Sequence, residues 1–162
     1  MRVIFLDFDG CLNSVGSFIY NNRLVLMGLT KIPSYESFDP IACSNLQYVL
    51  EELPDVQVVV SSTWRKYKTL AALQEIFKTN NLLPERMIGT TPESEEGYRG
   101  KEIESWLKDH PEVTEFVIVD DDSDMEPYMD RLVKTDGRNG FTFTDAEKVI
   151  EMFGGKDEKQ NG

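Results

Sequence analysis

The sequence predicts an α/β fold, a three-layer sandwich in which helices cover both faces of a mainly parallel, five-stranded sheet. Apolar, β-branched runs alternate along the chain with segments of helical periodicity, an order typical of parallel sheets with right-handed crossovers. Runs such as Val58-Val59-Val60 are apolar at every position, as expected of strands buried on both faces. A chain of 162 residues with 40% hydrophobic residues is long enough to bury a core of this kind.

Each element is predicted from a local pattern. The strands are expected where β-prone apolar residues run together, at 2–6, 56–60, 86–89, 115–119 and, more weakly, 131–134. The helices are expected where apolar residues recur every three or four positions, at 41–53, 70–77, 103–107 and 146–153. For the last helix, Thr144 is the predicted N-terminal cap and Gly154 the predicted stop.

One segment interrupts the alternation of strands and helices. Residues 14–38 follow the first strand, contain many large apolar side chains and are too few for a second domain. We expect a small flap or hairpin over the end of the strand, with a loop packed on the core as the alternative. The whole of 1–154 is therefore predicted to be a single domain without a large cap, and the polar residues 155–162 a frayed tail.

Charge and composition exclude several classes of function. A formal net charge of −12 argues against broad electrostatic binding to nucleic acid or to an anionic membrane surface, although it leaves room for a local basic site in a cleft. The only two cysteines, Cys11 and Cys43, lack the spacing of a zinc site or a disulfide framework. The chain shows no signal peptide and no apolar run of membrane-spanning length, so we expect a cytoplasmic protein with no membrane partner.

The first predicted strand ends in two carboxylates, Asp7 and Asp9, followed by Gly10. Residues two apart on a strand point to the same side, and a turn at the glycine also leaves both carboxylates in one small volume. Such a pair is costly unless a cation, a shared proton or chemistry keeps it there. A strand followed by an ordinary Asp-Gly turn is the alternative explanation.

Polar residues also follow two other strands. The second strand runs into Ser61-Ser62-Thr63, and the fourth runs into a cluster of acidic residues that begins with Asp120 and Asp121. Lys101 opens the helix just before that strand. Each feature taken singly has an ordinary explanation, as a helix cap, a solvated turn or a surface lysine. Together they fall at the carboxyl edge of a parallel sheet, where ligands bind.

This order of motifs (acidic pair, hydroxyl, lysine, acidic pair) resembles the haloacid dehalogenase (HAD) superfamily of phosphotransferases, from Asp7 to about Asp124. The resemblance implies a Rossmann-like sheet and a phosphatase that works through an aspartyl phosphate. By this resemblance Asp7 is the nucleophile and Asp9 the general acid/base. Ser61 or Ser62 would hold the phosphoryl oxygens, and register favours Ser61 because it is the first polar residue after the strand. Gly10 would help to bind the phosphoryl group, and Lys101 would neutralise its charge.

The resemblance also implies a Mg²⁺ cofactor held by Asp7, Asp9, Asp120 and Asp121. Oxygen ligands in an octahedron, completed by water and substrate, suit this ion. We favour Asp121 as a direct ligand, with Asp120 next. Asp124 is expected to support the site or to cap a turn.

A narrower resemblance concerns the residues after the second strand. Ser-Ser-Thr-Trp-Arg, together with Arg-Gly-Lys and a tryptophan in the following helix, is similar to small HAD-type domains associated with RNA repair. On this interpretation Trp64 stacks a base and Arg65 grips a second phosphate. The alternative is that Trp64 packs on the core and Arg65 pairs with a surface acid.

The sequence therefore predicts a Mg²⁺-dependent phosphomonoesterase, with a polynucleotide 3′-phosphate as the first expected substrate. A nucleotide, a sugar phosphate or a phosphoprotein is the next choice, and a non-catalytic HAD-like binding module is the alternative of another class. A receiver domain fits poorly because its lysine follows every acidic motif. A calcium loop at Asp120 fails because Met125 and Arg131 stand where glycine and glutamate are needed.

Overall fold

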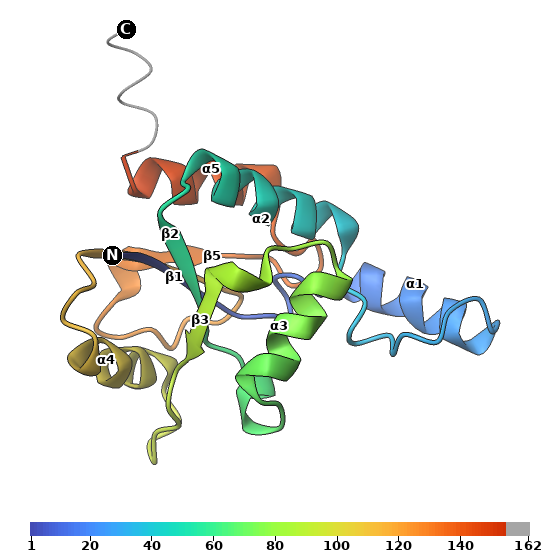
Figure 1. Ribbon diagram of the computed structural model, residues 1–162, viewed down its shortest axis with the longest axis horizontal. Helices are drawn as coiled ribbons and strands as arrows, with labels where there is room; N and C mark the ends of the chain where they lie inside the picture. The colour runs from blue at the N-terminus through green and yellow to red at the C-terminus, as the bar shows by residue number, and fades with distance from the viewer. Residues whose placement is uncertain (155–162) are drawn as a thin grey trace, which may run out of the picture.

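The computed structural model describes residues 1–154, so the predicted tail at 155–162 lies outside the described residues. Five strands form one sheet in the order β3-β2-β1-β4-β5, and every neighbouring pair is parallel (Figure 1). The strands are β1 (Arg2–Leu6), β2 (Val56–Val60), β3 (Met87–Thr90), β4 (Glu115–Asp120) and β5 (Leu132–Lys134). The predicted α/β fold is confirmed, and the strands lie within about one residue of their expected positions.

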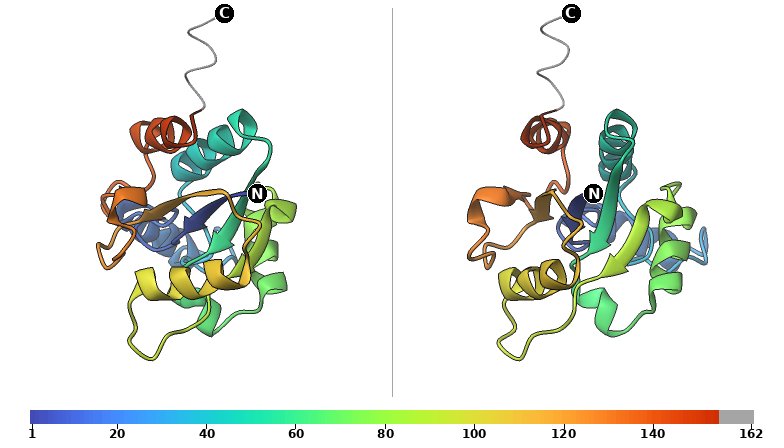
Figure 2. Two further views of the ribbon diagram at one scale, coloured as in Figure 1. Left: turned by 90° about the vertical axis from the view of Figure 1, so that its left-hand side faces the viewer. Right: turned by 60° about the vertical axis from the view of Figure 1, so that its left-hand side comes forward.

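Helices cover both faces of this sheet. Ile4 and Leu6 of β1 point to the face covered by α2 (Pro40–Glu52), α3 (Leu70–Thr79) and α5 (Phe143–Met152). Val3 and Phe5 alternate with them and point to the face covered by α4 (Arg99–Asp109). Figures 1 and 2 show α2 and α5 packed side by side, with α4 beyond the strands from them. Both faces are buried, which explains why the strands are apolar without alternation.

The ends of α5 differ in part from the prediction. Thr142 rather than Thr144 caps the helix: its hydroxyl accepts a hydrogen bond from the Asp145 amide, and the Asp145 carboxylate accepts one from the Thr142 amide. This reciprocal capping box places Thr144 inside the first turn. Gly154 follows the helix with a φ of +73°, a left-handed conformation suited to glycine, so the predicted stop is confirmed.

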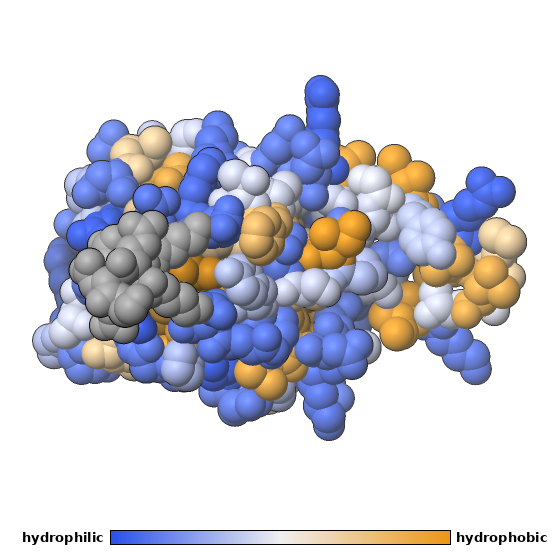
Figure 3. All heavy atoms as spheres, turned by 90° about the horizontal axis from the view of Figure 1, so that it is seen from above, coloured by the Kyte–Doolittle hydropathy of each residue, from blue (hydrophilic) through white to orange (hydrophobic). Residues whose placement is uncertain are grey.

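The segment 14–38 forms a helix that the sequence pattern does not reveal. Helix α1 (Val15–Leu26) is capped by Ser14 and has no buried side chain, and the chain then returns to α2 through a loop. The helix projects beyond the sheet in Figure 1, and Figure 3 shows apolar residues at that end of the molecule. Its exposed large apolar side chains are Val15, Phe18, Ile19, Tyr20, Val25 and Leu26. The division into one domain over 1–154 stays a prediction.

Within residues 1–154, no helix combines the length and the apolar composition that a membrane crossing needs.

The capping box gives a matched test of the fold. Replacing Thr142 with alanine removes one bond of the box and is expected to lower the free energy of unfolding by about 1 kcal/mol. Thr144→Ala, two residues further on, removes no capping bond and is expected to change the stability far less. Urea unfolding of the two variants checks this, and equal losses would show that the cap contributes nothing specific.

Candidate active site

The register of the central strands builds the site. Leu6 pairs with Val60 on one side and with Val119 on the other. The next residue of each strand, Asp7, Ser61 and Asp120, therefore stands in one row at the carboxyl edge of the sheet. Chain connections run in opposite directions from β1 and β4, so this row lies at the topological switch point, where open α/β sheets bind ligands.

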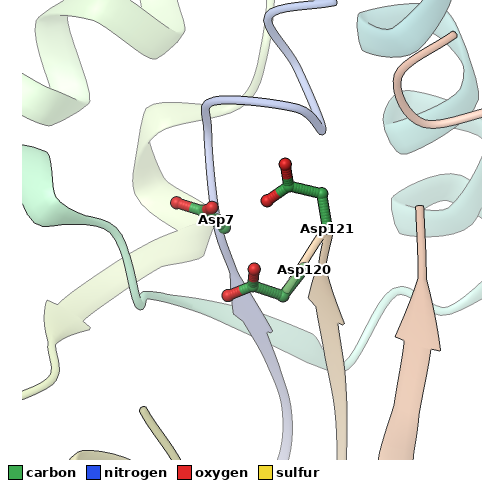
Figure 4. Close-up of side chains that lie close together, drawn as sticks. All are labelled: Asp7, Asp120 and Asp121. Carbon is green, nitrogen blue, oxygen red and sulfur yellow. The ribbon is translucent and has the colours of Figure 1, made fainter. Parts of the chain in front are cut away.

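Three carboxylates meet at this point. Asp7, Asp120 and Asp121 each offer an oxygen, and the three oxygens lie within 4.8 Å of one another at the ends of β1 and β4 (Figure 4). Asp7 and Asp120 are buried, whereas Asp121 is exposed. Gly10 makes room for the group, because a Cβ there would stand 2.2 Å from an Asp121 carboxylate oxygen. Position 10 therefore requires glycine, because any side chain there would collide with Asp121.

Burial of like charges shifts the protonation of the two inner carboxyls. Burial raises the pKa of Asp7 to about 6, against the lowering effects of the Arg99 guanidinium, the Phe8 amide and the Ser62 hydroxyl. Burial, followed by the charge of Asp7, raises the pKa of Asp120 to about 8. The protein alone therefore does not fully stabilise the ionised pair.

Arg99 is the cation that lies at these carboxylates. Its Nη1 atom stands 3.4 Å from Asp7 Oδ1 and 3.3 Å from Asp120 Oδ2, and it also donates to the carbonyl of Ser61. The Arg99 amide donates to Asp124 at 3.1 Å, so Asp124 supports the first turn of α4. The sequence analysis missed Arg99, although Arg99 begins the same helix as Lys101, the lysine predicted to neutralise the phosphoryl charge.

The structure does not bring Lys101 to the site. Its side chain is 49% exposed, and its Nζ atom lies 3.2 Å from Glu104 on the same helix. Residues two apart on an α-helix point about 200° away from each other, so Arg99 and Lys101 cannot both face the sheet edge. The basic side chain at Asp7 is therefore Arg99.

The two serines after β2 differ in their contacts. The Ser62 hydroxyl makes the hydrogen bond that lowers the pKa of Asp7. The Ser61 hydroxyl is also fully buried, but it has no hydrogen-bond partner among the described residues. A buried hydroxyl without a partner is unfavourable, so Ser61 Oγ has a free donor to offer at this edge. The sequence favours Ser61 over Ser62 as the phosphate-binding hydroxyl, and this choice stays a prediction.

The carboxylate of Asp9 lies apart from the acidic cluster. Trp64 Nε1 donates to Asp9 Oδ2 at 2.9 Å, and Asn13 Nδ2 donates to Oδ1 at 3.4 Å. The metal-ligand cluster found among the described residues contains Asp7, Asp120 and Asp121 without Asp9. The structure thus does not bring the Asp9 side chain to the expected metal ligands, and Asp9 is an exposed residue.

Trp64 and Arg65 are both engaged by the protein itself. Trp64 is 9% exposed, and its ring centroid lies 5.3 Å from that of Phe8. The faces of the Trp64 ring are therefore not free to stack on a base. Arg65 lies 2.6 Å from Glu102, with both side chains at most 5% exposed, and it donates to the Ser62 carbonyl. Arg65 thus has an acidic partner, as in the alternative, although the acid is buried; this pairing disfavours a grip of Arg65 on a second phosphate, which stays a prediction.

The donor set fits a hard divalent cation. All the clustered ligands are carboxylate oxygens, which Mg²⁺ prefers, and one guanidinium does not balance three carboxylates. The Asp120 Oδ2 atom is buried and makes no hydrogen bond; its contact is the ion pair with Arg99 Nη1 at 3.3 Å, which is consistent with an oxygen that can bind an ion. Asp7, Asp120 and Asp121 are the residues that would hold such an ion.

Comparison with known proteins agrees with this geometry. Residues 3–146 match the model of the family described as the HAD domain in Swiss Army Knife RNA repair proteins. Searches of the curated proteins and of the solved structures gave no significant match. The matched residues span the five strands and every element that carries the site. The chain belongs to the family of HAD domains found in Swiss Army Knife RNA repair proteins.

Proposed function

We propose that this protein is a Mg²⁺-dependent phosphomonoesterase that acts through an aspartyl-phosphate intermediate, with a 3′-phosphate at an RNA end as its substrate. The observation that carries the proposal is the position of Asp7, next to Asp120, Asp121 and Arg99 at the switch point of the sheet. The description of the matched family supports RNA as the substrate class. A nucleotide, sugar phosphate or phosphoprotein is the second choice.

The reaction divides between two aspartates. A carboxylate oxygen of Asp7 attacks phosphorus, and the bond between phosphorus and the leaving oxygen breaks to form the aspartyl phosphate. Asp9 gives its proton to the leaving oxygen and later takes a proton from the water that hydrolyses the intermediate. The hydrogen bonds from Trp64 and Asn13 hold the Asp9 carboxyl in one orientation for both transfers.

The remaining groups stabilise charge. Arg99 and the Ser62 hydroxyl contact Asp7, and the Ser61 hydroxyl follows the neighbouring strand without a hydrogen-bond partner among the described residues; these groups would neutralise and bind phosphoryl oxygens. When bound, Mg²⁺ would supply the positive charge that lets a carboxylate approach a phosphate dianion. Asp7, Asp120 and Asp121 provide its ligands. Arg99 keeps this group together in the absence of substrate.

The small size of the insertion between β1 and α2 bears on the size of the substrate. The insertion between β1 and α2 is one helix and a loop rather than a large cap domain. Large caps enclose small metabolites, whereas an open edge admits the end of a polymer. The charge of −12 opposes extended contact with a nucleic-acid backbone, so the proposal concerns a terminal nucleotide.

Because Asp7 is the proposed nucleophile, Asp7→Asn should abolish turnover while leaving the fold intact. Phosphate release from p-nitrophenyl phosphate, measured with Mg²⁺ and with EDTA, checks this, and circular dichroism checks the fold. Asp130→Asn changes an exposed carboxylate 78% open to solvent and is the matched control. Full activity of Asp7→Asn would exclude Asp7 as the nucleophile, whereas no phosphate release by the wild-type protein would leave a binding module as the better explanation.

Arg99 and Lys101 give a second matched pair. Arg99→Gln removes the cation beside Asp7 and should lower kcat by about 10²-fold, the usual effect of losing one charge-stabilising donor. Lys101→Gln changes a half-exposed side chain that contacts Glu104, and it should leave kcat close to the wild-type value. Steady-state kinetics decides between them, and the reverse order of effects would restore Lys101 as the functional cation.

The carboxylate cluster predicts a stabilisation by metal. The folded state holds three converging carboxylates and the unfolded state does not. Mg²⁺ should therefore bind the folded state and raise the Tm. Asp121→Ala removes an exposed ligand and should abolish the rise, whereas Asp130→Ala should keep it. Thermal unfolding with and without Mg²⁺ gives the answer, and an equal rise in both variants would mean that the ion binds elsewhere.

A further inference from the structure

A recess of about 400 Å³ opens beside Asp9, and none of its lining residues belongs to the acidic cluster. It is lined by Asp9, Tyr35, Thr63, Trp64, Tyr67 and Lys68. The general acid must touch the leaving oxygen, so a recess that shares Asp9 is placed to hold whatever that oxygen belongs to. Its volume is within the range of pockets that bind small ligands or parts of larger ones.

The walls of the recess favour a flat, apolar group. Tyr35 and Trp64 meet edge to face with centroids 6.0 Å apart, and Tyr67, another lining residue, is 85% exposed. Because Trp64 is packed against Phe8 and bonded to Asp9, it forms a fixed wall. Tyr67 is the aromatic residue with an open face, and exposed aromatic rings stack on planar ligands at little entropic cost.

The charges of the recess disfavour a second phosphate. Its one cation, Lys68, stands 2.7 Å from Glu36 and 5.9 Å from the Tyr35 ring centroid, so its charge is already balanced. Asp9 adds a carboxylate to the same space. An anionic group would be repelled there, whereas a neutral ring with polar edges would not be.

From this arrangement we propose that the recess binds the nucleobase of the terminal nucleotide, stacked on Tyr67, while the phosphate lies at Asp7. The inference rests on the proposed function and deepens it by assigning the site of the leaving nucleoside. A neutral base fits the balanced charge, and its ribose would extend from the recess past Asp9 toward the phosphate at Asp7. The protein thereby recognises one nucleotide rather than a length of backbone, which agrees with its strongly acidic surface.

Direct binding tests this without requiring turnover. The ligand is a 5′-labelled, 3′-phosphorylated oligoribonucleotide, measured by fluorescence anisotropy with Asp7→Asn protein in Mg²⁺. Adding Tyr67→Ala to that protein should raise Kd about tenfold, as expected for the loss of one base–ring stack. Tyr67→Phe keeps the ring and should leave Kd unchanged. Tyr20→Ala removes a tyrosine 62% exposed on α1, outside the recess, and is the matched control.

A second ligand separates base recognition from a general loss of affinity. The same oligonucleotide with an abasic terminal ribose should bind more weakly, and Tyr67→Ala should then have no further effect. Equal losses on both ligands, or no loss on the base-bearing one, would overturn the proposal. Binding of a phosphotyrosine peptide that depends on Tyr67, without binding of the oligonucleotide, would also overturn it. Phosphate release by the wild-type enzyme is a separate readout, so failure of the proposed reaction would be recognised independently.

Discussion

The crowding of Asp7, Asp120 and Asp121 at one sheet edge is the constraint around which the rest of the site is arranged. Parallel register makes the crowding unavoidable, because Asp7, the residue after β1, stands next to Asp120, the last residue of β4. Two of these carboxyls are buried, and burial of like charges is unfavourable unless other groups offset it. The site is therefore best described by the groups that offset the cost of burying these carboxylates and by the negative charge that those groups leave unbalanced.

The offsetting groups come from the β2 edge and from α4. Ser62 follows β2 and bonds Asp7, while Arg99 begins α4 and reaches both inner carboxyls. Close packing keeps α4 in place: a Cβ at Gly100 would stand 2.1 Å from the Glu126 carbonyl oxygen. Asp9 is excluded from this group by its bond to Trp64. Two aspartates two residues apart thus have different surroundings, as a nucleophile and a proton carrier require.

The features that could be predicted from the sequence are those that depend on the pattern of neighbouring residues. The ranges of β1 and β2 follow from uninterrupted apolar runs, and the carboxylate cluster follows from strand ends in a parallel sheet. Helix α1 buries no side chain, so packing imposes no apolar stripe that would disclose it. Arg99 and Lys101 are both basic and two apart, and only the orientation of α4 distinguishes them. The bond between Trp64 and Asp9 joins residues 55 apart, a contact no local pattern indicates.

The buried pair of Arg65 and Glu102 has a consequence for how this sequence can diverge. The ion pair joins the turn after β2, which contains Arg65, to α4, which contains Glu102. Loss of either partner alone would leave an uncompensated charge in the interior, a change that typically costs about 3–5 kcal/mol, whereas joint replacement by apolar residues of similar volume is often neutral. Descendants of this chain should therefore retain both residues or exchange both, and the single-substitution intermediates form a barrier between those two solutions.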